Sequence, residues 1–279
     1  MKKTILITGC SSGIGHCVAH GLHQRGYRVF ATARRQESVE SLLAEGLESF
    51  QLDLSDSSSI KRAAEETLQR SNGELYALFN NGAYGLPGAA EDLGREALRA
   101  QFETNVFGWV ELTNLLLPIM RRQGYGRIIQ NSSVLGFAAM PFRGAYNASK
   151  YAVEGWSDTL RLELRGSGIH VSLIEPGPIA TRFRANAMKA FERDIDAGRS
   201  FHREKYAAIR NRLNKPGPAV PFTLPPEAVL EKVIHALEVG TPKARYYVTF
   251  PTHLFGFLKR ILPVSLLDMI LAKAGNDHQ

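Results

Sequence analysis

The chain has 279 residues, of which 44% are hydrophobic and 22% are charged, and its formal net charge is +7 at pH 7. This length allows a full hydrophobic core, and the composition excludes a fibrous or disordered protein. Two cysteines exclude a disulfide framework and favour a reducing compartment, so we expect a cytoplasmic protein. We predict one globular domain over residues 1–279.

The apolar run Ile5–Ile7 is too short for the core of a signal peptide, and no apolar run in the chain is long enough for a transmembrane helix. The positive charge is compatible with nucleic acid, an anionic membrane surface or an anionic ligand. Much of it lies between Arg182 and Lys215 without forming a block, so a solvated surface is the preferred interpretation. We expect no nucleic-acid partner.

Short β-rich apolar runs alternate with segments that have the apolar spacing of helices. The predicted strands cover residues 2–8, 27–33, 47–53, 75–80, 126–133, 169–175 and 245–250. A first predicted helix begins after Gly15 and ends at Gly26. Further helices are predicted over residues 55–70, 95–120, 144–165 and 225–237. This alternation predicts an α/β fold with a single Rossmann-type, doubly wound parallel sheet of about seven strands and helices on both faces.

A glycine-rich turn, Thr8-Gly9-Cys-Ser-Ser-Gly13-Ile-Gly15, joins the first strand to the first helix. Glycines permit a tight turn and let backbone N–H groups approach a pyrophosphate, whose charge the helix N-terminus favours. Such a turn alone is a weak signal, but the strand–turn–helix context favours dinucleotide binding. Cys10, Cys17, His16 and His20 could supply metal ligands. Four ligands at the start of one helix would compete with the turn, so we expect no metal site.

The end of the second strand carries Arg34-Arg35 and no acid. An acid at this position would hold the ribose hydroxyls of NAD, whereas an arginine accommodates a 2′-phosphate. The alternative is a pair of solvated arginines. The missing acid favours NADP(H) as the cofactor.

Polar residues end the third and fourth strands, at Asp53 and at Asn80-Asn81-Gly82-Ala83. Open α/β sheets bind ligands at the carboxyl ends of their strands. Asn105 lies inside the predicted helix 95–120, where asparagine is mildly unfavourable. A hydrogen bond between packed helices is the alternative explanation for Asn105.

Tyr146 and Lys150 are four residues apart, so on a helix they share one face. We expect the ammonium group to lower the pKa of the tyrosine, which could then exchange a proton with a carbonyl or an alcohol. This spacing is common by chance. The pair Ser132-Ser133 upstream and the glycine turn favour a catalytic interpretation.

Two segments fall outside the alternating pattern. Residues 179–221 lose clear periodicity, and we predict a substrate lid there. Large apolar side chains occur in this segment and after the serine strand. They could cover a lipophilic carbonyl substrate, or they could belong to the ordinary core. These residues are Phe137, Met140, Phe142, Phe183, Met188, Phe191 and Tyr206. The apolar extension 252–279 contains Lys259-Arg260 and could touch a membrane surface, although packing is preferred.

Together these features resemble the short-chain dehydrogenase/reductase family, from Thr4 to about Phe250. The resemblance implies hydride transfer between a nicotinamide cofactor and a carbonyl or alcohol carbon. It implies four catalytic residues, Asn105, Ser133, Tyr146 and Lys150. It also implies a set of cofactor-binding residues: Gly9, Ser11, Ser12, Gly13, Ile14, Gly15, Arg34, Asp53, Asn80, Tyr146, Lys150, Ile179 and Thr181.

By this resemblance, Ser133 polarises the substrate carbonyl, Tyr146 supplies the proton and Lys150 holds the nicotinamide ribose. Asn105 helps to hold a water that relays protons, and Asp53 contacts the adenine. The family usually has Asn-Asn-Ala-Gly where this chain has Asn-Asn-Gly-Ala at residues 80–83. A positive φ at residue 83 would therefore carry a cost.

Within the family the chain is similar to the branch of 17β-hydroxysteroid and retinol dehydrogenases, and looks closest to bacterial NADP-dependent aldehyde reductases. The resemblance implies NADP(H)-dependent interconversion of a lipophilic aldehyde or ketone and its alcohol, in the reductive direction, by a homodimer or homotetramer. The alternatives are an oxidative steroid or retinol dehydrogenase, an epimerase or dehydratase, and a catalytically silent NADP-sensing protein.

Overall fold

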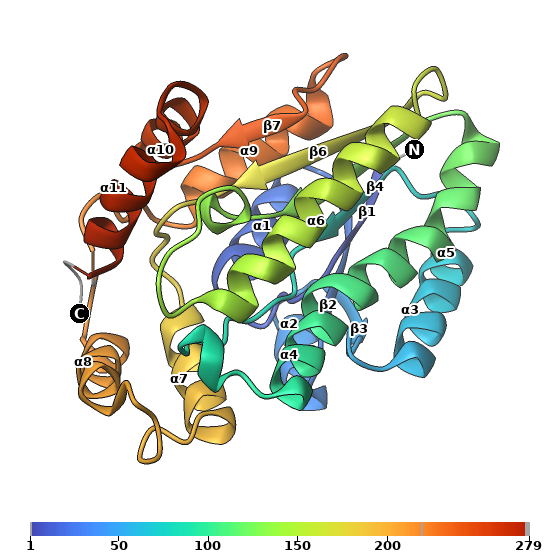
Figure 1. Ribbon diagram of the computed structural model, residues 1–279. Coiled ribbons are helices and arrows are strands. Elements are labelled where there is room, and N and C mark those ends of the chain that lie inside the picture. Colours follow the sequence, from blue (N-terminus) through green and yellow to red (C-terminus); the bar gives the residue numbers. More distant parts are fainter. Residues whose placement is uncertain (1, 219, 277–279) are drawn as a thin grey trace.

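A seven-stranded parallel sheet forms the centre of the molecule in this computed structural model, which describes residues 2–218 and 220–276 (Figure 1). The strand order is β3-β2-β1-β4-β5-β6-β7, so the winding direction reverses between β1 and β4. Ligands of open α/β sheets bind at the carboxyl ends of the strands beside such a reversal. The strands are β1 (Thr4–Ile7), β2 (Arg28–Ala33), β3 (Glu48–Gln51), β4 (Ala77–Asn80), β5 (Gly126–Asn131), β6 (Ile169–Glu175) and β7 (Arg245–Tyr247).

Helices cover both faces of the sheet, which confirms the predicted doubly wound α/β fold (Figure 1). Side chains along a strand point alternately to opposite faces, and Ile5 and Ile7 of β1 pack in one core while Leu6 packs in the other. The first core lies under α1 (Gly13–Gln24), α2 (Gln36–Ala44) and α9 (Glu227–Glu238). The second core lies under α3 (Ser57–Arg70), α5 (Gly108–Gln123) and α6 (Gly144–Glu163).

The helix predicted over residues 95–120 is not continuous. It consists of α4 (Arg95–Phe102) and α5, joined by a π-helical turn, η2 (Glu103–Phe107), with Asn105 at its centre. Gly108 closes this turn with a hydrogen bond to the carbonyl of Glu103. A side chain at Gly108 would meet the carbonyl oxygen of Leu54 at 2.1 Å, so the helix passes very close to the end of β3. The π turn directs the Asn105 side chain to the loop after β4 and to α6, where it contacts Tyr84 and Ser149.

The segment 179–221 was predicted to lack periodic structure, but it contains two helices, α7 (Phe183–Asp194) and α8 (Arg203–Asn214). Their apolar side chains pack mainly on each other and on the loop after β4, forming a separate small core. The two ends of the segment are tied together, since Ala180 N–H donates to the carbonyl of Leu224 (2.9 Å) and Leu224 N–H donates to Pro178 (3.1 Å). Residue 219 of this segment lies outside the described residues.

The seventh strand is shorter than predicted, because it ends at Tyr247 and Phe250 begins a helix. Pro251 stands in the first turn of that helix, where its missing N–H costs nothing. The extension forms α10 (Phe250–Ile261) and α11 (Val264–Asn276), and residues 277–279 lie outside the described part of the chain. Short 3-10 turns complete the structure, η1 (Ala90–Asp92) and η3 (Val134–Gly136).

Candidate active site at the carboxyl ends of the strands

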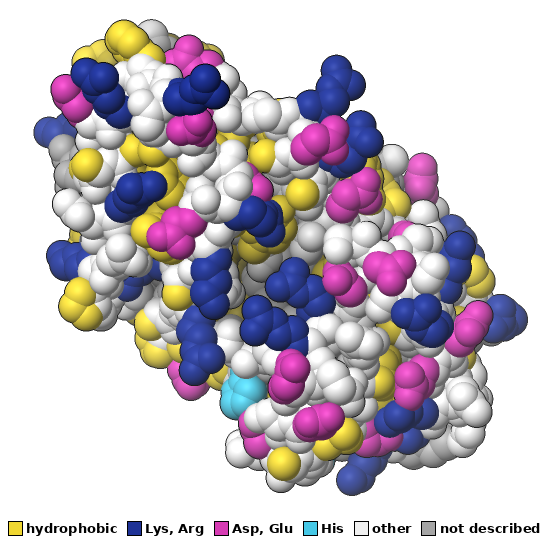
Figure 2. All heavy atoms as spheres, turned by 90° about the horizontal axis from the view of Figure 1, so that it is seen from below, with side chains coloured by type: hydrophobic (Ala, Val, Ile, Leu, Met, Phe, Trp, Pro, Cys, Tyr) yellow, Lys and Arg dark blue, Asp and Glu magenta, His cyan; other side chains and the backbone are white. Residues whose placement is uncertain are grey.

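A cavity of about 1500 Å³ lies at the carboxyl ends of the strands. It brings together ten of the predicted site residues, from the glycine turn, the end of β5, α6 and the loop after β6: Gly9, Ser11, Ser12, Gly13, Ile14, Ser133, Tyr146, Lys150, Ile179 and Thr181. Five predicted residues do not line it: Gly15, Arg34, Asp53, Asn80 and Asn105. Figure 2 shows one face of the molecule, on which lysine and arginine side chains gather around a hollow.

The glycine turn has the geometry that a dinucleotide cradle requires. Gly9 and Gly13 have φ values of +73° and +62°, a region that L side chains rarely adopt. A side chain at Gly9 would meet the Cα of Gly82 at 2.6 Å, and one at Gly15 would meet the carbonyl oxygen of Gly9 at 2.3 Å. Gly15 therefore acts by close packing inside the turn. The N-terminus of α1 is left open to the cavity, as a pyrophosphate would need.

The exchange of small residues at 82 and 83 carries no backbone strain. The non-glycine residues with positive φ in the described part of the chain are Asn72, Phe142 and Phe222, and Ala83 is not among them. The expected cost of a positive φ at residue 83 therefore does not arise. A side chain at Gly82 would meet the Cδ1 atom of Leu54 at 2.9 Å, so this position favours glycine because of packing.

The two asparagines at the end of β4 point in opposite directions. The amide of Asn80 is buried and donates to Thr113 Oγ1 (3.0 Å), away from the cavity. Asn81 lines the cavity instead; its amide donates to the carbonyls of Thr8 (3.0 Å) and Gly9 (3.2 Å). Sequence reasoning chose Asn80 and missed Asn81, although neighbouring side chains at a strand end face opposite ways.

Ser133 and Tyr146 lie next to one another in the cavity wall. The Ser133 hydroxyl accepts a hydrogen bond from Leu135 N–H (3.1 Å), which leaves its O–H free to donate. Burial raises the pKa of Tyr146 well above its ordinary value, and the hydrogen bond with Ser133 acts in the opposite direction. The tyrosine of this ligand-free chain is therefore a neutral phenol at physiological pH.

Lys150 does not lower the pKa of Tyr146 in the way that the sequence suggested. Its ammonium nitrogen is 5.6 Å from the centre of the Tyr146 ring and 4.3 Å from that of Trp109. It donates to the carbonyl of Asn131 (2.7 Å). Burial lowers the pKa of Lys150 to about 7, against the opposing charge of Glu154. The desolvation of Lys150 outweighs its attraction to Glu154, because both side chains are shielded from water.

Asn105 makes the helix-packing contact that was the alternative explanation for it. Its amide donates to the carbonyl of Tyr84 (2.9 Å) and to Ser149 Oγ (3.1 Å), and its oxygen accepts from Tyr84 N–H (3.2 Å). These bonds fix the loop after β4 against α6. The role of Asn105 in holding a relay water stays a prediction.

Arg35, rather than Arg34, lies beside the glycine turn. It lines a smaller hollow of about 670 Å³ together with Ser11 and Arg182. Arg34 follows β2 directly and is exposed outside both cavities. The Asp53 carboxylate also lies outside them, where it accepts from Ser55 N–H (2.9 Å) and Oγ (2.7 Å). The basic pair was visible in the sequence, but which member lies beside the glycine turn was not.

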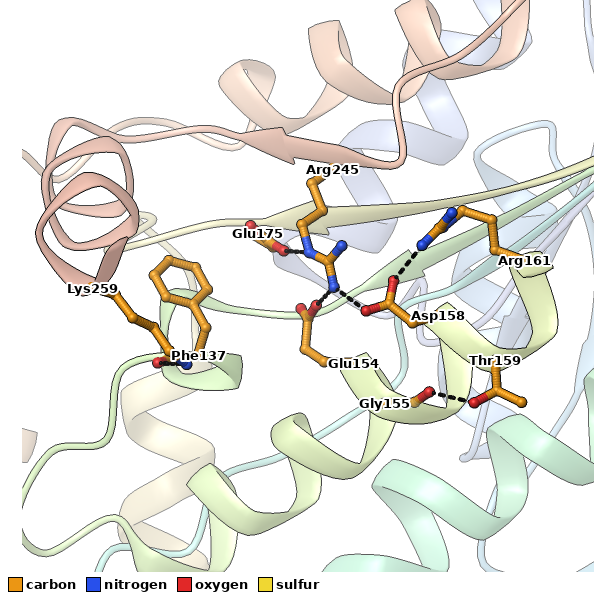
Figure 3. A network of polar contacts seen from close by, with 9 residues as sticks. All are labelled: Phe137, Glu154, Gly155, Asp158, Thr159, Arg161, Glu175, Arg245 and Lys259. Atoms are coloured by element: carbon orange, nitrogen blue, oxygen red, sulfur yellow. Dashed lines mark hydrogen bonds and ion pairs between the residues drawn. The ribbon is translucent and has the colours of Figure 1, made fainter. Parts of the chain in front are cut away.

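A partly buried ion network joins β6, β7 and α6 beside the candidate site (Figure 3). Arg245 of β7 contacts Glu175 at the end of β6 (3.1 Å) and Glu154 (3.1 Å) and Asp158 (2.6 Å) of α6. Burial, with the charge of Glu154, raises the pKa of Glu175 to about 9, and Arg245 opposes that shift. Glu154 lies one turn after Lys150, so the network anchors the helix that carries the Tyr–Lys pair. Sequence reasoning missed it, although two acids in buried elements were a signal.

Much of the cavity wall is apolar. Phe183 of α7 contacts Tyr146 edge-to-face, with ring centres 5.3 Å apart. Further apolar lining comes from the loop before α6, the end of α8, the loop after it and α10: Met140, Leu213, Val220, Phe222, Phe250, Leu254 and Phe255. Phe191 and Tyr206 are fully buried in the small core instead, so the packing explanation is correct for them. Phe137, Phe142 and Met188 do not line the cavity.

The fold, the glycine turn and the Ser–Tyr–Lys group define an oxidoreductase of the nicotinamide-dependent class. A model of the short chain dehydrogenase family matches residues 3–191, so the chain belongs to the short-chain dehydrogenase/reductase family. It is 44% identical over 271 residues to the uncharacterized oxidoreductase YbbO of Escherichia coli, covering 97% of this chain and 94% of that protein. It is 34% identical over 263 residues to human 17-beta-hydroxysteroid dehydrogenase type 1, covering 89% and 78%.

Solved structures give the same result. A single-substitution variant of the actinorhodin polyketide ketoreductase with NADPH is 28% identical, with a TM-score of 0.73 over 88% of this chain and 95% of that one. A short-chain dehydrogenase/reductase from Burkholderia phymatum in complex with NAD is 26% identical, with a TM-score of 0.76 over 97% and 95%. Structures similar to this chain therefore hold either nicotinamide cofactor.

Proposed function

We propose that this chain is an NADP(H)-dependent reductase of lipophilic aldehydes or ketones. The observation that carries the proposal is the meeting of Ser133, Tyr146 and Lys150 in one cavity whose remaining wall is largely apolar. Polar groups at one point of an apolar pocket are typical of a site that orients one functional group of a hydrophobic molecule.

The three polar side chains have complementary roles in this proposal. The free O–H of Ser133 donates to the substrate oxygen and stabilises the negative charge that develops there. Tyr146, neutral because its pKa is raised, supplies the proton as a general acid. Lys150, with a pKa of about 7, exchanges protons near working pH and recharges the tyrosine. When bound, the cofactor supplies the hydride.

The preference for NADP(H) rests on the hollow beside Ser11. Arg35 and Arg182 both line it, and a guanidinium suits a phosphate better than a ribose hydroxyl. No acid ends β2, where an NAD-selective chain would need one. The glycine turn would hold the pyrophosphate, with Ile179 and Thr181 on the nicotinamide side.

The test is NADPH consumption with carbonyl compounds from short aldehydes to retinal and ketosteroids. Turnover should rise with the lipophilic members, and Tyr146→Phe should lower kcat about 10²–10⁴-fold while NADPH affinity stays nearly constant. Tyr151→Phe is the matched control, because Tyr151 is a half-exposed tyrosine of the same helix, outside the cavity. Equal turnover in Tyr146→Phe and the wild type would refute the catalytic assignment.

Two alternatives are separated by the same assay. An oxidative steroid or retinol dehydrogenase, favoured by the similarity to the human 17-beta-hydroxysteroid enzyme, would reduce NADP⁺ with the corresponding alcohols more efficiently than it reduces carbonyls. A catalytically silent NADP-sensing protein would bind NADPH tightly and turn over no member of the panel.

The assembly and location belong to the proposal as well. We propose a single domain over residues 1–279 with a lid at 179–221 and an extension at 252–279, forming a cytoplasmic homodimer or homotetramer. The two cysteines are free, as expected in a reducing compartment. Within residues 2–218 and 220–276, none of the helices is long and apolar enough to cross a membrane.

The helix α10 packs one face on the body through Thr252 and Phe255 and exposes an apolar row on the other. The row has the spacing of one helix face and consists of Phe250, Leu254, Phe257 and Ile261. A second copy of the chain or an anionic membrane surface would cover it. Flotation with anionic liposomes, with and without residues 252–279, and light scattering of the free protein distinguish the two.

A further inference from the structure

Two histidines and a glutamate converge at the surface between α1 and α2. His16 and His20 are one turn apart on α1, and Glu45 follows the last residue of α2. The Nε2 atoms of His16 and His20 lie 2.8 and 2.7 Å from the same carboxylate oxygen, Oε2 of Glu45. One candidate ligand atom from each residue lies within 4.8 Å of those of the other two.

The spacing of these atoms is close to that of a metal site. Zinc binds imidazole nitrogen and carboxylate oxygen at about 2.0–2.2 Å, so two ligands of a tetrahedral ion lie about 3.3 Å apart. The observed separations of 2.7 and 2.8 Å would need to open by about half an ångström, which side-chain torsions allow. The backbone of both helices could stay in place.

The carboxylate is held by a further contact. Ser41 Oγ donates to the other carboxylate oxygen, Oε1 of Glu45, at 3.0 Å. This bond keeps Oε2 directed at the two histidines, in the way that outer-shell partners orient metal ligands. All of these residues lie on regular helices or directly at their ends, so the arrangement does not depend on a loop.

We propose that His16, His20 and Glu45 form a binding site for a divalent transition metal ion such as Zn²⁺. Two imidazoles and one carboxylate are a ligand set that zinc uses, and three protein ligands leave a position for water. The same hollow contains Ser11 and Arg35, so that position opens toward the side of the glycine turn. The expectation of no metal site considered ligands on the first helix only, and Glu45 comes from the next one. This inference does not rest on the proposed function.

The test is a titration of the full chain, freed of metal with EDTA and without cofactor, with ZnCl₂ in a calorimeter. We expect one saturable site per chain that excess Mg²⁺ does not compete for, because Mg²⁺ prefers oxygen ligands. His20→Gln and Glu45→Gln each remove a direct ligand. We expect each to weaken Zn²⁺ binding by about 10–100-fold or more, because removal of an outer-shell partner alone costs that much. His23→Gln is the matched control, an exposed histidine of the same helix outside the cluster.

Circular dichroism and thermal unfolding establish that each variant is folded, and Co²⁺ absorption spectra report the coordination directly. The site is supported if His20→Gln and Glu45→Gln weaken Zn²⁺ binding and His23→Gln preserves it. Absence of saturable binding to the wild type, or equal Zn²⁺ affinity in His20→Gln and His23→Gln, overturns it and leaves a hydrogen-bonded cluster that ties α1 to α2.

Discussion

The substitution Glu175→Gln should change how the stability of the chain depends on pH. Glu175 is fully buried, and its pKa is raised to about 9 by burial and by the charge of Glu154. In the unfolded chain the same carboxyl loses its proton near its ordinary pKa of 4.5. Between these two values the unfolded state binds fewer protons than the folded state, so the free energy of unfolding falls as pH rises.

The size of the effect follows from the same shift. One fully linked proton changes the free energy of unfolding by about 1.4 kcal/mol per pH unit, or about 4 kcal/mol between about pH 5.5 and 8.5. Arg245 lies 3.1 Å from Glu175 and Glu154 competes for the same proton, so we expect about 1–3 kcal/mol. Glutamine copies the shape of the protonated acid and carries no such penalty.

The assay is urea unfolding of the wild type and Glu175→Gln at three pH values across that range. The stability of the variant relative to the wild type should rise with pH, and groups common to both proteins cancel in the difference. Asp158→Asn is the control in the same network: its pKa is lowered by Arg245 and Arg161 despite partial burial, so its contribution is lost only at acidic pH. A pH-independent difference for Glu175→Gln would refute the reasoning.

Three further predictions concern the cofactor and the substrate. Arg35→Ala should lower NADPH affinity about 10–100-fold and leave NADH affinity unchanged, because a charge-assisted bond to a phosphate contributes about 1.5–3 kcal/mol. Arg34→Ala should change neither affinity. A loss of NADPH affinity in Arg34→Ala but not in Arg35→Ala, measured by titration, would reinstate Arg34. Phe183→Ala should raise KM for long aldehydes more than for short ones in steady-state assays, and equal changes would remove Phe183 from the substrate site. Gly9→Ala should abolish cofactor binding, measured by NADPH fluorescence, because the added methyl meets Gly82 at 2.6 Å; normal binding would show that the turn relaxes.

The fold could be predicted because strands and helices alternate clearly and each strand ends in a turn signal. The glycine turn, Ser133, Tyr146 and Lys150 could be predicted because their spacing along strand ends and one helix already brings them to one face. The helices of segment 179–221 could not be predicted, since side chains such as Phe191 and Tyr206 are ordered by packing on the loop after β4. Their structure depends on contacts that no local pattern records.

The sequence alone could not decide between adjacent residues or set the depth of burial. Asn80 and Asn81 are neighbours with the same chemistry, and a shift of one position at a strand end reverses the direction of the side chain. Arg34 and Arg35 lie in the turn between β2 and α2, where the local turn geometry decides which of them faces the hollow. The pKa of Tyr146 was expected to fall because a positive charge lies nearby in sequence, but it rises because the phenol is desolvated. That balance requires the positions of all surrounding atoms.

The hydrogen bonds between Ala180 and Leu224 and between Leu224 and Pro178 have an evolutionary consequence. They close residues 179–224 into a module whose two ends meet after β6, while its helices α7 and α8 lie outside the sheet. Lengthening a closed loop costs only about 0.6 kcal/mol per doubling, so insertions in the connection between α7 and α8 should cost little stability, whereas the helices themselves are held by their packed core. On the proposed function, substrate range can therefore diversify by exchange of one contiguous piece of gene that leaves Ser133, Tyr146 and Lys150 in place.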